Sequence, residues 1–262
     1  MKRIVITLFL AALLSHALPA QTPASPKLLI THIYDSVALL YIQDSSGDMR
    51  MACTATAFSA TPKGYRFVSA AHCVVGDDDK QQQLQKFYIS ADTKGTKAYF
   101  PAKLVQAGDK ALGDDFSLFE VDTADHFDTI NLGDEDKLKL GDLVNNIGGA
   151  LGMGKQFFVG YVSELHIDRP PVDAGEVHWT DLMLIQVGGG PGSSGSAIVS
   201  VDQNAIVGFL VGTAQSDVGK LCVPVSKFKA FLTLVDAGNY KKSKKPTETS
   251  NLTGEQRLSR AY

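Results

Sequence analysis

Several features that would indicate other classes of protein are absent from this chain. Its 262 residues include three cysteines and one tryptophan, and its six histidines show no spacing typical of metal ligands. Beyond the N-terminal segment, no apolar run approaches the roughly 20 residues needed to span a bilayer. The sequence therefore predicts no metal site, no cofactor and no stable membrane anchor.

Excess positive charge is also missing from most of the chain. The whole sequence carries a net charge of −3, but residues 239–262 hold six Lys/Arg and two Asp/Glu, and Lys2 and Arg3 add two positive charges. Residues 21–238 therefore carry −9, which argues against nucleic-acid binding. We expect the basic tail at 239–262 to be disordered and solvated, with contact to an anionic surface as the alternative.

The N-terminus has the three-part layout of a secretory signal peptide. Two basic residues precede an apolar run from Ile4 to Leu14, and small residues follow at Ala17 and Ala20. The run is shorter than a membrane-spanning helix requires. We expect a signal peptide at residues 1–20 and a secreted or periplasmic mature protein.

Short β-rich runs separated by turn residues dominate the rest of the chain. This pattern is typical of β-barrels and β-sandwiches. The one predicted helix is terminal: Ser226 is its expected cap, apolar residues from Phe228 to Val235 follow helical spacing, and Gly238 ends it. The predicted runs are Leu28–His32, Val37–Ile42, Ala55–Ser59, Arg66–Ser69, Phe87–Ile89, Phe116–Val121, Leu143–Ile147, Gln156–Val162, Leu182–Val187, Ala197–Val201 and Ala205–Thr213.

A turn of small residues at 188–197, with the sequence Gly-Gly-Gly-Pro-Gly-Ser-Ser-Gly-Ser-Ala, presents a candidate nucleophile, Ser194. Taken alone, such a cluster is more often a flexible loop. His72 follows a predicted strand and supplies a candidate base, and Asp115 precedes another strand and supplies a candidate acid to orient the imidazole. Asp114 is the competing acid, with a solvated turn carboxylate as the role of whichever aspartate is not used.

The chain order of these residues separates unrelated folds that share this chemistry. An α/β-hydrolase places its histidine after the serine, and no histidine follows Ser194 here. The subtilisin order needs an acid before His72, and the aspartates there lie in no supporting motif. The order His72, Asp115, Ser194 remains.

Three segments around these residues carry a resemblance to a known family. Ser69-Ala70-Ala71-His72-Cys73, Asp115-Phe116-Ser117-Leu118 and Gly192-Ser193-Ser194-Gly195-Ser196-Ala197 resemble the histidine, aspartate and serine motifs of the chymotrypsin-like serine peptidases. Ala197 stands where the family usually has proline. The likeness covers most of residues 30–235 and is nearest to the bacterial branch of HtrA-like and glutamyl-endopeptidase-like enzymes.

The resemblance implies an all-β fold with two six-stranded antiparallel β-barrels and a short C-terminal helix. The first barrel, at 21–135, carries His72 and Asp115, and the second, at 136–238 with the closing helix, carries Ser194. Because the segment after residue 238 is shorter than a PDZ domain, we expect no PDZ domain of the kind that follows the protease in HtrA-like proteins. The family's oxyanion hole falls on the backbone N–H groups of Gly192 and Ser194.

Two cysteines are also assigned through the resemblance. In the family, the cysteine after the catalytic histidine pairs with one on a neighbouring strand, which implies a disulfide between Cys73 and Cys53. Cys222 is left over, either as a small buried residue or as an exposed reactive thiol. Ser193 stands where animal enzymes carry the aspartate that pairs with a newly released N-terminus, so no activation of that kind is expected.

The resemblance places the pocket for the substrate side chain before the cleaved bond (P1) at Gly188, Gly212, Thr213 and Ala214. No acid lies at position 188, so the counter-charge for a basic P1 residue is missing. We expect a small or medium apolar P1 residue, with an acidic one as the alternative if Lys220 faces inward. The predicted function is an exported serine endopeptidase acting on protein or peptide substrates; a silent protein-binding member of the fold and an exported esterase are the alternatives.

Overall fold

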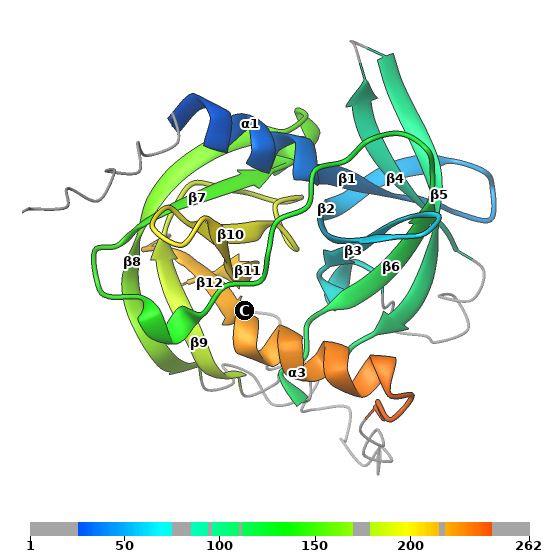
Figure 1. Ribbon diagram of the computed structural model, residues 1–262. Helices are drawn as coiled ribbons and strands as arrows, with labels where there is room; N and C mark the ends of the chain where they lie inside the picture. The colour runs from blue at the N-terminus through cyan, green and yellow to red at the C-terminus, as the bar shows by residue number, and fades with distance from the viewer. Residues whose placement is uncertain are drawn as a thin grey trace, which may run out of the picture.

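The computed structural model describes residues 26–74, 85–93, 96–109, 112–169, 179–214 and 218–242. They form two closed, six-stranded antiparallel barrels that lie side by side (Figure 1), as the family resemblance implies. A short helix lies along the top of the view and a second helix along the bottom. The predicted signal peptide at 1–20 and the tail beyond residue 242 lie outside the described residues.

The first barrel has the strand order β1-β2-β3-β6-β5-β4 and closes through pairing of β1 with β4. Its interior is packed with apolar side chains, among them Leu40, Phe67, Ile89 and Phe119. The strands are β1 Val37–Gln43, β2 Met49–Thr61, β3 Gly64–Ser69, β4 Lys86–Thr93, β5 Thr96–Ala107 and β6 Ser117–Asp122.

The second barrel repeats the arrangement with the order β10-β11-β12-β9-β8-β7, closed through pairing of β7 with β10. Its core includes Val144, Ile185, Ile198 and Val207. The strands are β7 Leu143–Gly148, β8 Gln156–Arg169, β9 Trp179–Gln186, β10 Ala197–Ser200, β11 Ala205–Thr213 and β12 Lys220–Pro224.

An aromatic cluster joins the two barrels to the C-terminal helix α3, Val225–Asp236. Phe116, which directly precedes β6, packs against Phe209 of β11 and against Phe228 and Phe231 of α3, with ring centroids 5.2–5.7 Å apart. Phe228 also meets Phe58 of the first barrel edge to face. Burying such rings is a large apolar contribution, so this cluster fixes how the barrels sit against each other.

Two local predictions were wrong. Leu28–His32, predicted as a strand, lies within helix α1, Pro26–Ser36. Proline suits a first helical turn, and Ile30 and Ile33 lie about one helical turn apart, with Ile33 fully buried. Tertiary burial of one helical face thus outweighs the β-propensity of this segment.

The start of α3 also differs from the prediction that Ser226 caps it. Pro224 occupies the cap position and offers no side-chain cap. The carboxylate of Glu135, from a distant turn, instead accepts the backbone N–H of Ser226 at 3.1 and 3.2 Å. A carboxylate at a helix N-terminus also opposes the positive end of the helix dipole. Gly238, in a left-handed conformation, follows the helix end as predicted.

No helix in the described part of the chain is long and apolar enough to cross a membrane.

Candidate active site

The candidate acid and base come from adjacent strand ends of the first barrel. Ser69 at the end of β3 pairs with Ser117 at the start of β6, so the residues beyond these ends are neighbours. His72 lies in a short 3-10 turn, Ala71–Cys73, after β3, and Asp115 lies two residues before the start of β6. The hydroxyl of Ser117 donates to the carbonyl of Ala70 at 3.0 Å and ties the two segments together.

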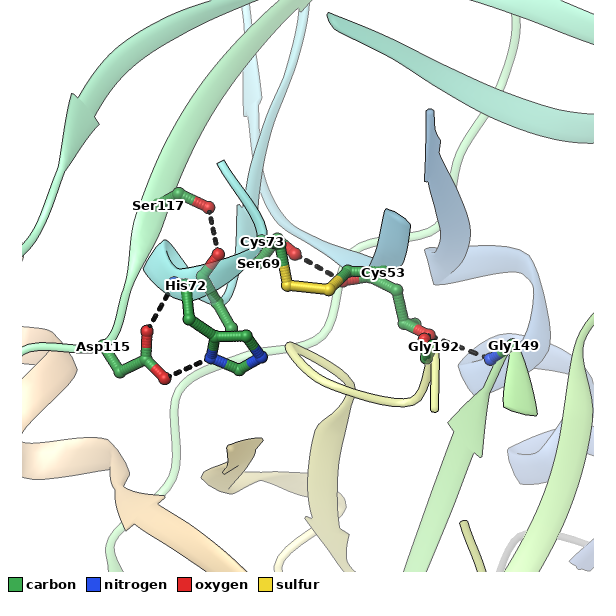
Figure 2. Close-up of a disulfide and its surroundings, with 10 residues drawn as sticks. Cys53, Ser69, His72, Cys73, Asp115, Ser117, Gly149 and Gly192 are labelled. Carbon is green, nitrogen blue, oxygen red and sulfur yellow. Dashed lines mark hydrogen bonds and ion pairs between the residues drawn. A yellow bond between two sulfur atoms is a disulfide. The ribbon is translucent and has the colours of Figure 1, made fainter. Parts of the chain in front are cut away.

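The His72 ring and the Asp115 carboxylate face each other directly (Figure 2). Asp115 Oδ2 lies 2.5 Å from His72 Nδ1, and Oδ1 accepts the backbone N–H of His72 at 2.7 Å. Asp115 is 1% exposed, whereas about a quarter of the His72 side chain reaches solvent. Because an ionised carboxylate only accepts, the contact selects the tautomer with the proton on Nδ1 and leaves Nε2 as a lone-pair base.

The neighbouring aspartate has a different partner. Asp114 Oδ2 accepts a hydrogen bond from the hydroxyl of Tyr240 at 3.1 Å, and that hydroxyl accepts the backbone N–H of Asp109 at 2.9 Å. Partial burial raises the pKa of Asp114, while the Tyr240 hydroxyl and the charge of Lys227 oppose this rise. Asp115 therefore contacts the His72 ring, whereas Asp114 contacts Tyr240 and helps to hold the loop before β6.

The candidate nucleophile loop is shaped by two glycines on either side of the serines. Gly192 has φ +96° and Gly195 has φ +81°, a left-handed region that favours glycine. A Cβ atom at Gly195 would lie 2.5 Å from Ser69 Oγ of the first barrel. Ser193 is fully buried and its hydroxyl accepts the N–H of Gly190 at 3.2 Å, whereas Ser194 is partly exposed.

Two backbone carbonyl groups in and next to this loop accept hydrogen bonds, and this fixes the direction of the N–H groups that follow them. The Pro191 carbonyl accepts from Leu151 N at 2.7 Å, and the Ser193 carbonyl accepts from Ser196 N at 3.0 Å. In a trans peptide the N–H points opposite to the C=O of the same unit. The N–H groups of Gly192 and Ser194 therefore point to the side opposite the Leu151 and Ser196 N–H groups that bind these carbonyls.

The residues expected to bind the P1 side chain come from two places in the second barrel. Gly188 follows β9, and a Cβ atom there would overlap the Phe158 ring. Gly212 and Thr213 end β11, and Ala214 N donates to Gly219 O at 3.0 Å. Thr213 pairs with Lys220 of β12.

Lys220 is almost completely buried, an unusual place for an ammonium group. Its Nζ donates to Thr213 Oγ1 at 3.2 Å. A positive charge therefore lies beside one of the expected P1 residues.

The predicted disulfide is present between Cys53 of β2 and Cys73, with Cα atoms 6.1 Å apart. It lies between His72 and the glycine pair Gly149 and Gly192 in Figure 2. The two sulfurs and a His72 ring nitrogen lie within 4.8 Å of one another, but sulfurs bonded to each other offer no thiolate to a metal.

Of the two roles expected for Cys222, the structure shows the buried one. It lies in the core of the second barrel with no exposed surface, and burial raises its pKa. A thiol held in its neutral form is a poor nucleophile, which excludes the exposed reactive role.

Thr54 is a residue of the site that the sequence did not reveal. It is buried in β2 next to Cys53, yet it hydrogen-bonds both to the nucleophile loop and to the turn that begins at Gly149. A threonine within a β-rich run is ordinary by composition. The contact depends on the packing of one barrel against the other, which no local pattern encodes.

Comparison with known proteins agrees with this architecture. Residues 53–209 match the family model described as "Trypsin-like peptidase domain". The solved structure of the HtrA-type protease AlgW with a decapeptide superposes with a TM-score of 0.64 at 17% identity, covering 82% of this chain and 69% of that one. AlgW with a tripeptide gives 0.61 at 19% identity, covering 82% and 64%. Deg5 gives 0.61 at 18% identity, covering 83% and 95%.

Proposed function

The chain belongs to the family of trypsin-like peptidase domains, and we propose that it is an exported serine endopeptidase that uses Ser194, His72 and Asp115. The observation that carries this proposal is the pairing of the His72 ring with the buried Asp115 carboxylate beside a glycine-bounded serine loop. A protein that only bound others through this fold would have no chemical need for that pairing. Such a binding protein would also not need the N–H groups of Gly192 and Ser194 to point away from the loop carbonyls.

In the proposed first step, Ser194 Oγ attacks the carbonyl carbon of the scissile bond while its proton passes to His72 Nε2. The carbonyl electron pair moves to the oxygen, which accepts hydrogen bonds from the N–H groups of Gly192 and Ser194. Asp115 stabilises the imidazolium that forms. Collapse of this adduct breaks the C–N bond, and His72 gives its proton to the leaving amine.

An acyl-enzyme on Ser194 is left after the first product departs. A water molecule then attacks the ester carbonyl and passes a proton to His72. Return of that proton to Ser194 Oγ releases the acid product. The same backbone donors serve both steps because each forms an oxyanion at the same place.

Peptides are the substrate class that we propose. The similar structures include AlgW with a decapeptide and AlgW with a tripeptide, which supports peptides as the class of ligand. Residues Gly188, Gly212, Thr213 and Ala214 would line the P1 site. The buried ammonium of Lys220 beside Thr213 favours the acidic alternative over the apolar one, because it places a positive charge near the expected P1 site.

A fluorogenic peptide library tests this choice. Preference for Asp or Glu at P1 that disappears in Lys220→Met would support the role of the ammonium. Preference for apolar P1 residues in both proteins would contradict it. Thr213→Val serves as a control that removes the hydroxyl partner and keeps the charge.

Export is proposed from the signal-peptide layout at residues 1–20. The Cys53–Cys73 disulfide supports it, since such bonds persist in oxidising compartments. Expression of the full chain, with mass spectrometry of the exported product, tests both location and cleavage after Ala20. A product that keeps residue 1 and stays in the cytoplasm would contradict the proposal.

The central test is labelling of the purified protein with a fluorophosphonate probe, with Ser194→Ala as the control. Ser194-dependent labelling followed by digestion of casein supports the endopeptidase. Labelling with ester hydrolysis but without cleavage of any protein or library peptide would favour the esterase. Folded protein that shows no Ser194-dependent labelling would eliminate both enzymes and leave the silent binding protein.

A further inference from the structure

We propose that Thr54 is a positioning residue that holds the backbone donors of the nucleophile loop in their working orientation. Thr54 belongs to the first barrel, whereas the loop belongs to the second. The proposal rests on the proposed function, since it assigns a role in stabilising the oxyanion. It adds a residue outside the triad and outside the backbone donors themselves.

The hydroxyl of Thr54 joins two segments of the second barrel. It donates to the carbonyl of Gly192 at 2.8 Å and accepts the N–H of Gly149 at 2.8 Å. A hydroxyl has one donor hydrogen, so donation to Gly192 leaves its lone pairs for Gly149. The side chain therefore couples the turn at 149–152 to the loop at 192–195.

The main chain of Thr54 is committed to the same region. Its N–H donates to the carbonyl of Ser194 at 3.0 Å, and its carbonyl accepts the hydroxyl of Ser69 at 2.7 Å. Ser69 ends the strand that leads into His72. One buried residue thus contacts the segment before the candidate base and two carbonyls of the nucleophile loop.

These contacts complete the anchoring of the loop. The carbonyls of Pro191 and Ser193 are held within the second barrel by Leu151 N and Ser196 N. The other two carbonyls, those of Gly192 and Ser194, are held by Thr54. Every peptide unit from residue 191 to residue 195 therefore has its carbonyl fixed.

Gly192 needs such an anchor more than other residues do. Glycine has little intrinsic preference among backbone conformations, so its flanking peptide units rotate easily unless they are held. Rotation of the unit before Gly192 would swing its N–H out of the oxyanion site. The hydroxyl of Thr54 opposes this by fixing the carbonyl after Gly192, and through Gly149 it also positions the turn whose Leu151 N–H holds the carbonyl before it.

The test compares Thr54→Val with Thr54→Ser. Valine keeps the shape and the backbone N–H of threonine but removes the hydroxyl, leaving the Gly192 carbonyl and the Gly149 N–H without that partner. Serine keeps the hydroxyl. Thr56→Val is the matched control, because Thr56 lies two residues along the same strand, is equally buried, and its hydroxyl has no partner among the described residues.

The concentration dependence of fluorophosphonate labelling separates positioning from binding. We expect Thr54→Val to lower the maximal labelling rate by about 10- to 100-fold, below the roughly 10²- to 10³-fold cost of deleting an oxyanion donor outright. The half-saturating concentration should stay within about twofold. Thr54→Ser should recover most of the rate, and Thr56→Val should match the unaltered protein.

Amide hydrogen exchange gives a second readout that does not need activity. Exchange at Gly149 and Leu151 should accelerate in Thr54→Val and stay unchanged in Thr56→Val. The Gly149 N–H donates to the hydroxyl itself, and the Leu151 N–H, which donates to the Pro191 carbonyl, lies in the turn that begins at Gly149. Unchanged exchange, or a labelling rate within twofold of the unaltered protein, would overturn the proposal. So would an equal loss in Thr56→Val, or a Thr54→Ser protein as slow as Thr54→Val.

Failure of the proposed function has a different signature. In that case the unaltered protein itself shows no Ser194-dependent labelling. Faster exchange at Gly149 and Leu151 in Thr54→Val would then still support the anchoring role of Thr54. Unchanged exchange would reject that role as well.

Discussion

Two adjacent aspartates with different partners give the sharpest test of the candidate active site. Asp115→Asn and Asp114→Asn are the same nearly isosteric change, one position apart, and each removes one carboxylate charge. We expect the first to abolish most activity and the second to leave activity within about threefold of the unaltered protein. The two variants act as controls for each other.

The magnitude follows from what asparagine can offer His72. Asp115 presents one oxygen to Nδ1 at 2.5 Å and the other to the backbone N–H at 2.7 Å. An amide that keeps the backbone contact through its oxygen turns its NH₂ group toward Nδ1. The ring must then carry its proton on Nε2, where the base is needed, and such a tautomer error costs about 10⁴ in kcat, or roughly 5 kcal/mol.

Asp114 faces a hydroxyl donor instead. The Asn oxygen can still accept from Tyr240, so the loop keeps its contact. The assay is hydrolysis of a peptide or ester by purified variants, with circular dichroism to establish folding. Equal losses in both variants, or a fully active Asp115→Asn protein, would refute the assignment of Asp115 as the acid.

Three further predictions rest on other parts of the structure. Replacing Cys53 and Cys73 by serine opens a loop whose ends are 20 residues apart, which should cost about 3 kcal/mol and lower Tm by about 6–12 °C in calorimetry; an unchanged Tm would contradict this. Gly192→Ala puts a Cβ atom 2.6 Å from a backbone oxygen at φ +96° and should cut the fluorophosphonate labelling rate about 10²- to 10³-fold. Gly47→Ala, at a similar φ but with open space around it, should keep the rate of the unaltered protein. Equal labelling rates for the two variants would argue against the oxyanion role of Gly192. Burial raises the pKa of Asp114, so its neutral form stabilises the fold fully below the unfolded pKa of about 3.9, and this contribution is lost as pH rises through the folded pKa. As pH rises from the unfolded pKa to the folded pKa of Asp114, the Tm of Asp114→Asn should therefore increase relative to that of the unaltered protein. A constant or falling difference in Tm would contradict the burial effect.

The barrel architecture was predictable because its signals are local and repeated. Short apolar runs bounded by turn residues mark most strands, and the three motifs of the family resemblance indicated how those strands are arranged. The strands β5 and β12 were absent from the predicted runs. β5 contains Pro101 and two lysines, and β12 is only five residues long, so neither carries the apolar alternation that marks a strand.

Elements decided by distant contacts were not predictable in the same way. The segment at α1 has β-branched residues, but burial of Ile33 selects a helix. The first turn of α3 is capped by Glu135, which lies 91 residues before Ser226 in the sequence. A single sequence carries propensity and spacing, whereas these outcomes depend on which segment another part of the fold brings close.

The candidate site itself shows the same division. The short sequence patterns around His72 and Asp115 identified the pair, and the structure brings them within hydrogen-bonding distance. The choice between Asp114 and Asp115 also agrees with this geometry. Thr54 carried no signal, because its partners at 149, 192 and 194 lie in the other barrel.

Positioning across the barrel boundary is therefore the physical condition on which the proposed chemistry depends. At one end, Asp115 precedes Phe116, whose ring packs between the second barrel and α3, so the acid is held by a cluster that also holds the barrels together. At the other end, Thr54 follows the disulfide cysteine Cys53 and reaches the nucleophile loop. Packed cores and buried hydrogen bonds resist small shifts. The aromatic cluster around Phe116 and the hydrogen bonds of Thr54 therefore both restrict how far Ser194 can move relative to His72. A serine and a histidine on separate barrels can work as one site only under such restraint, since misplacement by about 1 Å can cost about 10²-fold in rate.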